Sequence, residues 1–227
     1  MTLGDPTPQY GSASFTEPTS HGYIYLGMRV APPRRGPFVR KSTKRNQAVE
    51  TCHSLARRLE ILADVVAATV YRAVLIPPVK GSLRFDVLVL IQTISPEAIP
   101  TVEAAEAYRQ LDADFIMRAR NIRRIGDVDL PRSGTFLFNH FSAADPERAL
   151  RTWENFSGWF TDKAGADDAA LLQPIDETAY VFVNHVRLPC GPIRFLLRFA
   201  KPSFRKYVTA NLKANQIRNA PVFCKTV

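Results

Sequence analysis

The stretch LRFDVLVLIQTISPE (residues 83–97) carries the clearest predicted strand of the chain and the start of the helix that follows it. Its aliphatic run at 87–91 has the length and composition typical of a buried β-strand. Ser95, Pro96 and Glu97 then supply a capping side chain, a proline for the first turn and an acid near the positive end of the helix dipole. The stretch therefore predicts a strand that runs directly into a helix.

Working outward from this stretch, the first half of the chain shows the order β-α-β-β-α-β. The first helix is expected after a basic loop, where Ser42 or Thr43 can cap it. The predicted strands are 22–30, 68–76, 83–94 and 114–122, and the predicted helices cover QAVETCHSLARRLEILADV and TVEAAEAYRQL.

The second half repeats the same order. A strand at TFLFNHFSA (135–143) is followed by Asp145-Pro146-Glu147, which again combines a cap, a proline and an acid, and Gly165 is the expected C-cap of that helix. Pro202 should kink or split the last helix, because proline lacks the backbone N–H. The remaining predicted elements are strands 170–175 and 179–188, a long helix at 192–212 and a short strand at 220–227.

Each half is the split βαβ arrangement of a ferredoxin-like unit. Such a unit carries its helices on one face of its sheet, so two units leave two bare faces, which can be buried against each other. The sequence thus predicts an α+β protein of two tandem βαββαβ units packed sheet to sheet, at 21–125 and 134–227, joined by the linker IGDVDLPRSG. Residues 1–20 are rich in Pro, Gly, Ser and Thr, and we expect a disordered, dispensable leader.

This arrangement resembles the dimeric α/β-barrel superfamily in its fused, two-unit form, over roughly residues 22–227. The resemblance implies small oxygenases that need no cofactor, isomerases and cyclases of aromatic or polyketide-like substrates, or haem-binding branches such as the chlorite dismutase and dye-decolourising peroxidase groups. The glycine-and-aspartate motif of the peroxidase group is not matched. No cofactor is therefore expected, with haem as the alternative.

The composition favours a cytoplasmic protein, and its charge indicates either an anionic partner or simply a solvated basic surface. The net charge is +9, residues 29–45 hold seven basic residues and no acid, and no Asp or Glu follows Thr178. The three cysteines are scattered without a CxxC pair, which suggests neither a disulfide framework nor a zinc site. No apolar run approaches the length of a transmembrane helix, and residues 1–20 do not read as a secretory signal.

Two predicted strands carry an Asn-His pair among apolar residues, at FLFNHF (136–141) and YVFVNHV (180–186). Because alternate strand residues face opposite sides, the aromatic positions suit the cavity between the sheets. This places His140 and Asn184 on the cavity face as candidate general base and oxyanion donor, and leaves Asn139 and His185 on the helix side. The competing interpretation is that these are hydrogen-bonded strand-end residues without a ligand. The expected aromatic walls of the cavity are Phe136, Phe138, Tyr180, Phe182, Tyr23 and Tyr25.

Arg72 and Arg118 occupy strand positions where charge is unusual, so they are candidate partners for a ligand carboxylate. More often, such residues lie on an open sheet face or at a strand end. No metal site is predicted.

The sequence favours an enzyme, or an enzyme-like binder, with an apolar or aromatic ligand between the sheets. The alternatives are an RNA-binding protein, which would expose its sheet aromatics, and a peripheral membrane protein, which would use its basic helix at 192–212. The substrate and the oligomeric state stay open.

Overall fold

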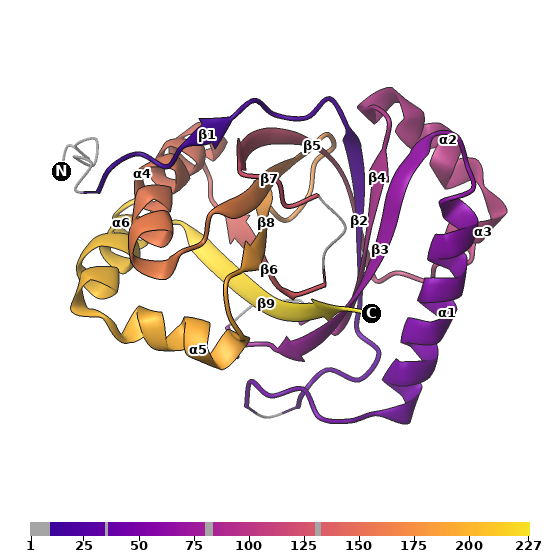
Figure 1. Ribbon diagram of the computed structural model, residues 1–227, viewed down its shortest axis with the longest axis horizontal. Helices are drawn as coiled ribbons and strands as arrows, with labels where there is room; N and C mark the ends of the chain where they lie inside the picture. The colour runs from indigo at the N-terminus through magenta and orange to yellow at the C-terminus, as the bar shows by residue number, and fades with distance from the viewer. Residues whose placement is uncertain (1–9, 35, 80–83, 130–132) are drawn as a thin grey trace.

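The computed structural model describes residues 10–34, 36–79, 84–129 and 133–227 (Figure 1). The first half contains β1 (Phe15–Thr16), β2 (Gly22–Met28), α1 (Thr43–Leu59), β3 (Val65–Leu75), β4 (Val87–Thr93), a short 3₁₀ turn (Pro96–Ala98), α2 (Ile99–Ala104), α3 (Glu106–Arg109) and β5 (Phe115–Ile125). The second half contains β6 (Thr135–Ser142), α4 (Pro146–Ala164), β7 (Asp168–Pro174), β8 (Phe182–Leu188), α5 (Pro192–Leu197), a 3₁₀ turn (Arg198–Ala200), a π-helical segment (Phe204–Thr209), α6 (Ala210–Ala214) and β9 (Arg218–Thr226).

Three predicted helix caps, at Ser42, Asp145 and Gly165, are confirmed. Ser95 precedes the 3₁₀ turn Pro96–Ala98, as predicted, but its side chain makes no capping hydrogen bond. Ser42 precedes α1 and its side chain accepts a hydrogen bond from the backbone N–H of Arg45. Asp145 does the same for α4, whose first turn holds Pro146. Gly165 ends α4 with a φ of 58°, in the left-handed region where glycine is favoured. Local sequence therefore fixes where the two long helices begin and where α4 ends.

The strands close into a single barrel. They pair in the order β5-β2-β4-β3-β9-β6-β8-β7, and β7 pairs again with β5, while β1 adds to the side of β5. Each half supplies a four-stranded antiparallel sheet with the strand order of a ferredoxin-like unit. The predicted α+β fold class is confirmed, and the structure adds how the sheets meet. They join along the β3–β9 and β5–β7 edges, which satisfies the edge backbone groups of all four strands.

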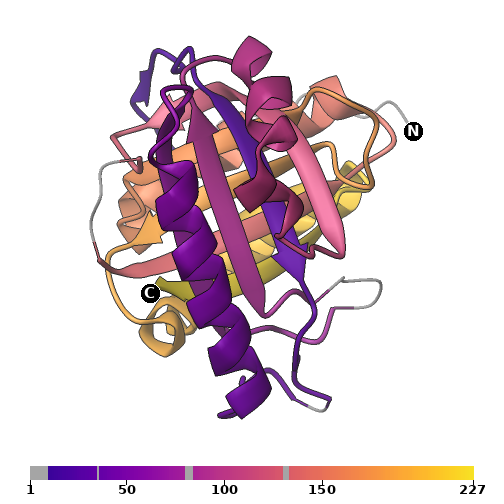
Figure 2. The ribbon, with the colours of Figure 1, turned by 90° about the vertical axis from the view of Figure 1, so that its right-hand side faces the viewer.

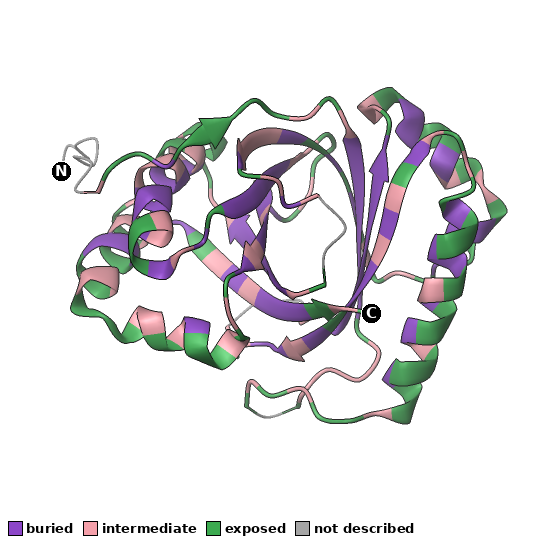
Figure 3. Cartoon of the chain, viewed as in Figure 1, coloured by how far each residue is buried: buried purple, intermediate pink, exposed green. Residues whose placement is uncertain are grey.

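Helices cover the outside of this barrel (Figures 1 and 2). Helix α1 lies along the first sheet with α2 and α3 beside it, and α4, α5 and α6 cover the second. The core accordingly divides into one apolar cluster under each helical layer and a third inside the barrel. Figure 3 shows the same division, with the strands mostly buried and the outer helix faces exposed.

The N-terminal segment is ordered from residue 10 onward, so the predicted disorder is wrong for residues 10–20; residues 1–9 lie outside the described ranges. Ala13 is only 5% exposed and belongs to the core under α4. The segment crosses α4 so closely that a Cβ on Gly158 would lie 1.8 Å from the carbonyl oxygen of Gly11. The composition of residues 10–20 could not reveal this contact, because the segment packs on α4, which lies more than 100 residues later in the sequence.

The predicted linker lies between two strands, since β5 ends at Ile125 and β6 begins at Thr135. The division into two domains at this linker stays a prediction. Pro202 follows a break in the predicted long helix, as expected, because extended backbone at Lys201 separates the 3₁₀ turn from the π-helical segment. None of the helices in the described ranges combines the length and apolar character needed to span a bilayer.

Candidate functional site

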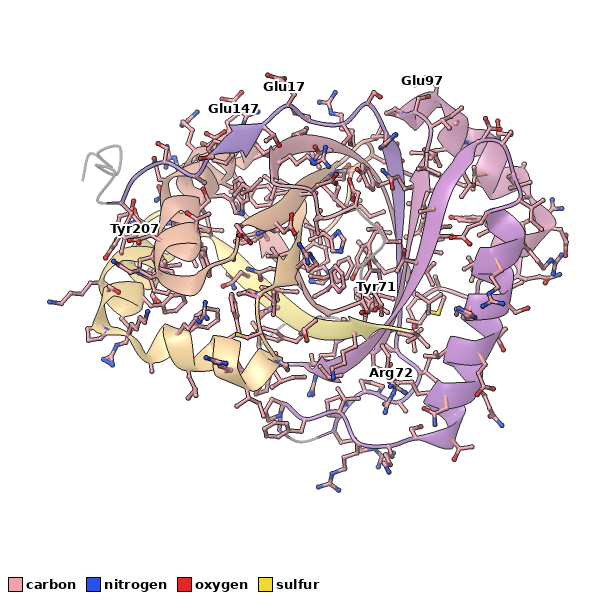
Figure 4. The ribbon with its side chains drawn as sticks, viewed as in Figure 1. Glu17, Tyr71, Arg72, Glu97, Glu147 and Tyr207 are labelled. Carbon is pink, nitrogen blue, oxygen red and sulfur yellow. The ribbon has the colours of Figure 1, made fainter. Side chains whose placement is uncertain are left out.

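The inner wall of the barrel is rich in aromatic side chains. Tyr23 and Tyr25 of β2 and Phe136 and Phe138 of β6 are at most 2% exposed and lie in the interior cluster, as the sequence predicts. Tyr71 of β3 joins them and projects into the interior in Figure 4. The predicted aromatic cavity face is therefore present on both sheets.

His140 also faces the interior, as predicted, and both of its ring nitrogens have partners. Nδ1 lies 2.8 Å from the carbonyl oxygen of Ala220, to which it donates, and Nε2 lies 2.8 Å from the hydroxyl of Tyr25. Burial lowers the pKa of His140 to about 4, against the opposing effect of the Ala220 hydrogen bond, so the ring is neutral at pH 7. The Tyr180 ring lies 4.9 Å from this imidazole, so Tyr180 is also an interior residue.

Asn184 and Phe182 lie on the helix side of β8, so their predicted position on the cavity face is wrong. Asn184 pairs with Asn139 across β6 and β8, and cross-strand partners project to the same side. Both line a small cavity of about 30 Å³ beneath α4, and Phe182 packs against Phe141 there. The error arises because residues 179–181 precede the regular strand, which begins at Phe182, and alternation counted from Tyr180 therefore gives the opposite face.

His185 takes the interior place that was predicted for Asn184. Its ring stacks on Phe138 with centroids 4.6 Å apart, and its Nε2 lies 3.3 Å from the Tyr71 hydroxyl. Burial lowers its pKa to about 3, so it too is neutral at pH 7. Its Nδ1 is buried and has no hydrogen-bond partner among the described residues. A buried ring nitrogen without a partner is uncommon, because buried polar atoms are nearly always hydrogen-bonded.

A pocket of about 670 Å³ opens onto this part of the interior. Its walls are mostly apolar, and its polar lining includes Tyr23, Tyr71, Asp129 and His185. The hydroxyl of Tyr23 donates to Oδ2 of Asp129 over 2.8 Å. Burial raises the pKa of Asp129, although the Tyr23 hydrogen bond opposes the shift. A largely apolar pocket of this size with a few convergent polar groups has the usual form of a small-molecule site.

The two candidate arginines lie outside the barrel, so they do not reach this pocket. Arg118 is half exposed and already bonds to the carboxylates of Glu103 and Asp176, at 2.8 and 2.9 Å. Arg72 is exposed and points away from the interior, opposite to Tyr71 (Figure 4). The interpretation as outer-face residues is the correct one for both.

The pocket residues that the sequence analysis did not select include Tyr71, Asp129 and His185. The alternation of β3 would have placed Tyr71 inside, since Ala73 shares its face. Pairing the two Asn-His strands in register would have found His185, because Asn139 opposite Asn184 forces both asparagines to one side. Asp129 lies in the predicted linker, where no sequence pattern marks it. Within the described ranges, no group of three or more His, Cys, Asp or Glu side chains could hold a metal ion.

Solved structures share this architecture over almost the whole chain. An anthrone oxidase-like protein matches with a TM-score of 0.61 at 11% identity, covering 91% of each chain. A variant of the chlorite dismutase from Candidatus Nitrospira defluvii matches with a TM-score of 0.55 at 6% identity, covering 92% of each chain. The chain has the dimeric α/β-barrel fold.

A haem-binding protein from Thermus thermophilus shares the dimeric α/β-barrel fold as well, with a TM-score of 0.51 at 12% identity over 96% of each chain. No protein-family model and no curated protein sequence matches the chain. At these identities the likeness shows the dimeric α/β-barrel fold alone.

Proposed function

We propose that the protein is an enzyme that binds an apolar or aromatic small molecule in the pocket at the end of the barrel and acts on it as an oxygenase, isomerase or cyclase. The observation that carries the proposal is His185, which lines this pocket and whose Nδ1 has no hydrogen-bond partner among the described residues. A ligand oxygen or hydroxyl supplies the missing hydrogen bond. The anthrone oxidase-like relative in fold supports an aromatic substrate.

The chemistry follows from two buried groups, the carboxylate of Asp129 and the neutral imidazole of His185. Asp129 in its ionised form can accept a proton from an acidic carbon or a phenol of the substrate, since its raised pKa makes it a better base than an ordinary carboxylate. If Tyr71 donates to Nε2 of His185, the neutral ring carries its proton on Nδ1 and can donate to the enolate-like oxygen. In an oxygenase the resulting carbanion passes its electrons to dioxygen. In an isomerase it is protonated again at another carbon.

The candidate base from the sequence, His140, keeps a supporting place in this proposal. It bonds to Tyr25 and Ala220 and lines neither the pocket of about 670 Å³ nor the small cavity beneath α4, so we assign it a positioning role for Tyr25. Asn184 lies under α4 and cannot share a pocket with His140. We therefore propose no catalytic role for Asn184.

Haem is bound by one of the proteins that share the fold. Nε2 of His140 and of His185 both contact a tyrosine hydroxyl, whereas Nδ1 of His185 has no hydrogen-bond partner among the described residues. We assign this nitrogen to an oxygen of the substrate, so the proposed steps use side chains of this protein and no haem.

RNA binding through sheet aromatics is not supported. The aromatic faces of both sheets turn toward each other inside the barrel, where Tyr23, Tyr25 and Phe138 are fully buried. Base stacking needs aromatic faces that a single strand can reach.

The test is binding and turnover with a panel of fused-ring phenols and aromatic ketones, anthrone among them. We expect binding by calorimetry, lost at least tenfold in His185→Phe. Turnover should fall about 10²–10⁴-fold in Asp129→Asn while binding persists, as for loss of a general base. Isotopically labelled dioxygen separates an oxygenase, which incorporates the label, from an isomerase or cyclase.

Asp176→Asn is the matched control, because this exposed carboxylate bonds to Arg118 outside the barrel. It should leave binding and turnover unchanged. Equal turnover in Asp129→Asn and the unmodified protein would remove Asp129 from the mechanism. Failure of every panel member to bind would overturn the proposed substrate class.

A further inference from the structure

Two basic segments that are far apart in the sequence lie at the same end of the molecule. Arg34 and residues 36–42 precede α1, whose first turn holds Lys44, and residues 192–201 form α5 and the turn after it. Both segments lie at the lower end in Figures 1 and 2. We call this surface the lower face, and its exposed side chains are Arg34, Phe38, Arg40, Lys41, Lys44, Ile193, Arg194, Leu197 and Lys201.

The charge of the lower face has one sign. The sequence holds no Asp or Glu between residues 29 and 49, nor from 178 to the C-terminus. Among the described residues, Arg34, Arg40 and Arg194 bond to no carboxylate, whereas Arg45, the buried basic residue of this region, bonds to Asp86. The exposed cations are thus available to an external anion, and they strengthen one another's attraction for it.

Three large apolar side chains protrude among these cations. Phe38, Ile193 and Leu197 are 59%, 58% and 68% exposed. The neighbouring Phe195 and Phe199 turn inward and pack against the core under the helices. Ile193 and Leu197 are four residues apart on α5 and so lie on one helix face. Exposed apolar groups set among basic side chains, on two segments at the same end of the molecule, mark a site of interaction.

We propose that the lower face binds an anionic lipid surface, with Phe38, Ile193 and Leu197 inserted at the level of the headgroups. The surrounding Arg and Lys side chains bind the lipid phosphates, which is the combination typical of interfacial attachment. A second copy of the chain fits less well, because a symmetric contact would place cations against cations. Single-stranded RNA fits less well because the segment on α5 exposes aliphatic rather than aromatic side chains.

The test is flotation of the full chain with vesicles of phosphatidylcholine, with and without phosphatidylserine. We expect binding to the anionic vesicles at about 0.1 M salt and its loss at about 1 M, where the Debye length falls from about 10 Å to about 3 Å. Vesicles of phosphatidylcholine alone should bind at least tenfold more weakly. Equal binding to both vesicle types, or binding to neither at low salt, would overturn the proposal.

Variants separate insertion from surface charge. Arg40→Glu with Lys41→Glu should weaken binding at least 25-fold, since each basic residue near an anionic surface contributes about fivefold. Ile193→Asn with Leu197→Asn should weaken it at least tenfold, because burial of even one aliphatic side chain corresponds to that factor. Ile61→Asn is the matched control, because Ile61 is 83% exposed but lies beyond the far end of α1 from residues 34–44. It should bind like the unmodified chain.

All these positions are exposed, so the melting temperature should stay unchanged and folding is not in question. If the Ile193→Asn, Leu197→Asn variant bound vesicles as strongly as the unmodified chain, the lower face would bind through charge alone and the proposed insertion would be wrong. Tighter and salt-resistant binding of single-stranded RNA would replace the lipid partner. If sedimentation showed a dimer, and Leu197→Asn dissociated that dimer, the partner of the lower face would be a second copy of the chain and not a lipid surface. None of these outcomes depends on catalysis in the barrel.

Discussion

At the scale of single residues, the barrel interior is organised by two imidazole–phenol pairs. His140 lies against Tyr25 and His185 against Tyr71, and all four side chains are at most 4% exposed. The first pair is fully hydrogen-bonded and the second leaves Nδ1 of His185 open. The first is therefore expected to support the fold and the second to meet a ligand.

Acid should destabilise the protein through these two histidines. Their pKa values fall from 6.5 to about 4 in His140 and to about 3 in His185, both by burial, so the unfolded chain binds more protons below pH 6.5. Each then costs about 1.4 kcal/mol of stability per pH unit as the pH falls from 6.5 toward 4. The pKa of Asp129 is raised, so above the ordinary pKa of a carboxylate the folded chain binds more protons at Asp129 than the unfolded chain does. Acid therefore stabilises the fold through Asp129 in that range, which offsets part of the loss of stability caused by the histidines.

Urea unfolding at several pH values between 4 and 7 measures the effect. His185→Phe should reduce the slope by about 1.4 kcal/mol per pH unit, because one titrating group is removed. His53→Phe is the control and should keep the slope, since His53 lies on the outer helix α1. An unchanged pH dependence of stability in His185→Phe would contradict the lowered pKa of His185.

Tyr25→Phe should destabilise the protein by about 1–3 kcal/mol, because Nε2 of His140 is left buried without its partner. The double variant with His140→Phe should cost less than the sum of the two single changes, as expected for residues in direct contact. Thermal unfolding of the four proteins measures the coupling. Strict additivity would show that the hydrogen bond contributes nothing.

Phe138→Ala should be more costly, at roughly 3–5 kcal/mol, because its fully buried ring stacks on both Tyr25 and His185. Phe38→Ala is the matched control, since its ring is 59% exposed, and it should change stability by less than about 0.5 kcal/mol. Urea unfolding distinguishes the two, and a similarly small effect at both positions would mean that the interior is loosely packed.

At the scale of elements, the N-terminal segment and α4 depend on each other. Ala13 of this segment is buried in the core cluster that contains Trp153 of α4, and Gly158 leaves room for the Gly11 carbonyl. A glycine within a helix is unfavourable by about 1 kcal/mol relative to alanine, so its presence is explained by this close approach.

Gly158→Ala should therefore have opposite effects in two versions of the chain. In the full chain it should destabilise by about 1–3 kcal/mol, because the added Cβ would lie 1.8 Å from the Gly11 oxygen. In a chain lacking residues 1–16 the clash is gone, and the same change should stabilise α4 by up to about 1 kcal/mol. Thermal unfolding of the four proteins gives the sign in each background, and equal signs would show that the segment does not rest on α4.

At the scale of the whole molecule, the two halves share two strand seams. β3 pairs with β9, and β5 pairs with β7, so both edges of the first sheet are hydrogen-bonded to the edges of the second. Neither sheet then keeps a free edge at these strands, so opening one half exposes the backbone groups and the interior aromatics of the other.

Unfolding should therefore be a single cooperative transition. Both tryptophans, Trp153 and Trp159, lie on α4 in the second half, so their fluorescence reports on that half and on the N-terminal segment packed against it. Far-ultraviolet circular dichroism reports on both halves, and the two denaturation curves should coincide. Curves that separate would show that the halves unfold independently in spite of the shared seams.

The sequence by itself determined the order of the elements, the caps at Ser42, Asp145 and Gly165, and the aromatic inner faces of β2 and β6. These features depend on neighbouring residues, because capping, turns and strand alternation act over a few positions along the chain. The resemblance based on that order of elements gave the fold class correctly.

Tertiary structure alone decided which Asn-His residue enters the barrel, where the N-terminal segment lies and that Asp129 meets Tyr23 across 106 positions of sequence. The face of β8 depends on where regular pairing with β6 begins, and Phe182 begins it. A shift of one residue moves every side chain of a strand to the other face, so a short irregular stretch before the strand reverses an assignment that composition alone supports. Contacts between distant elements, which closed the barrel and formed its pocket, leave no local pattern for the sequence to show.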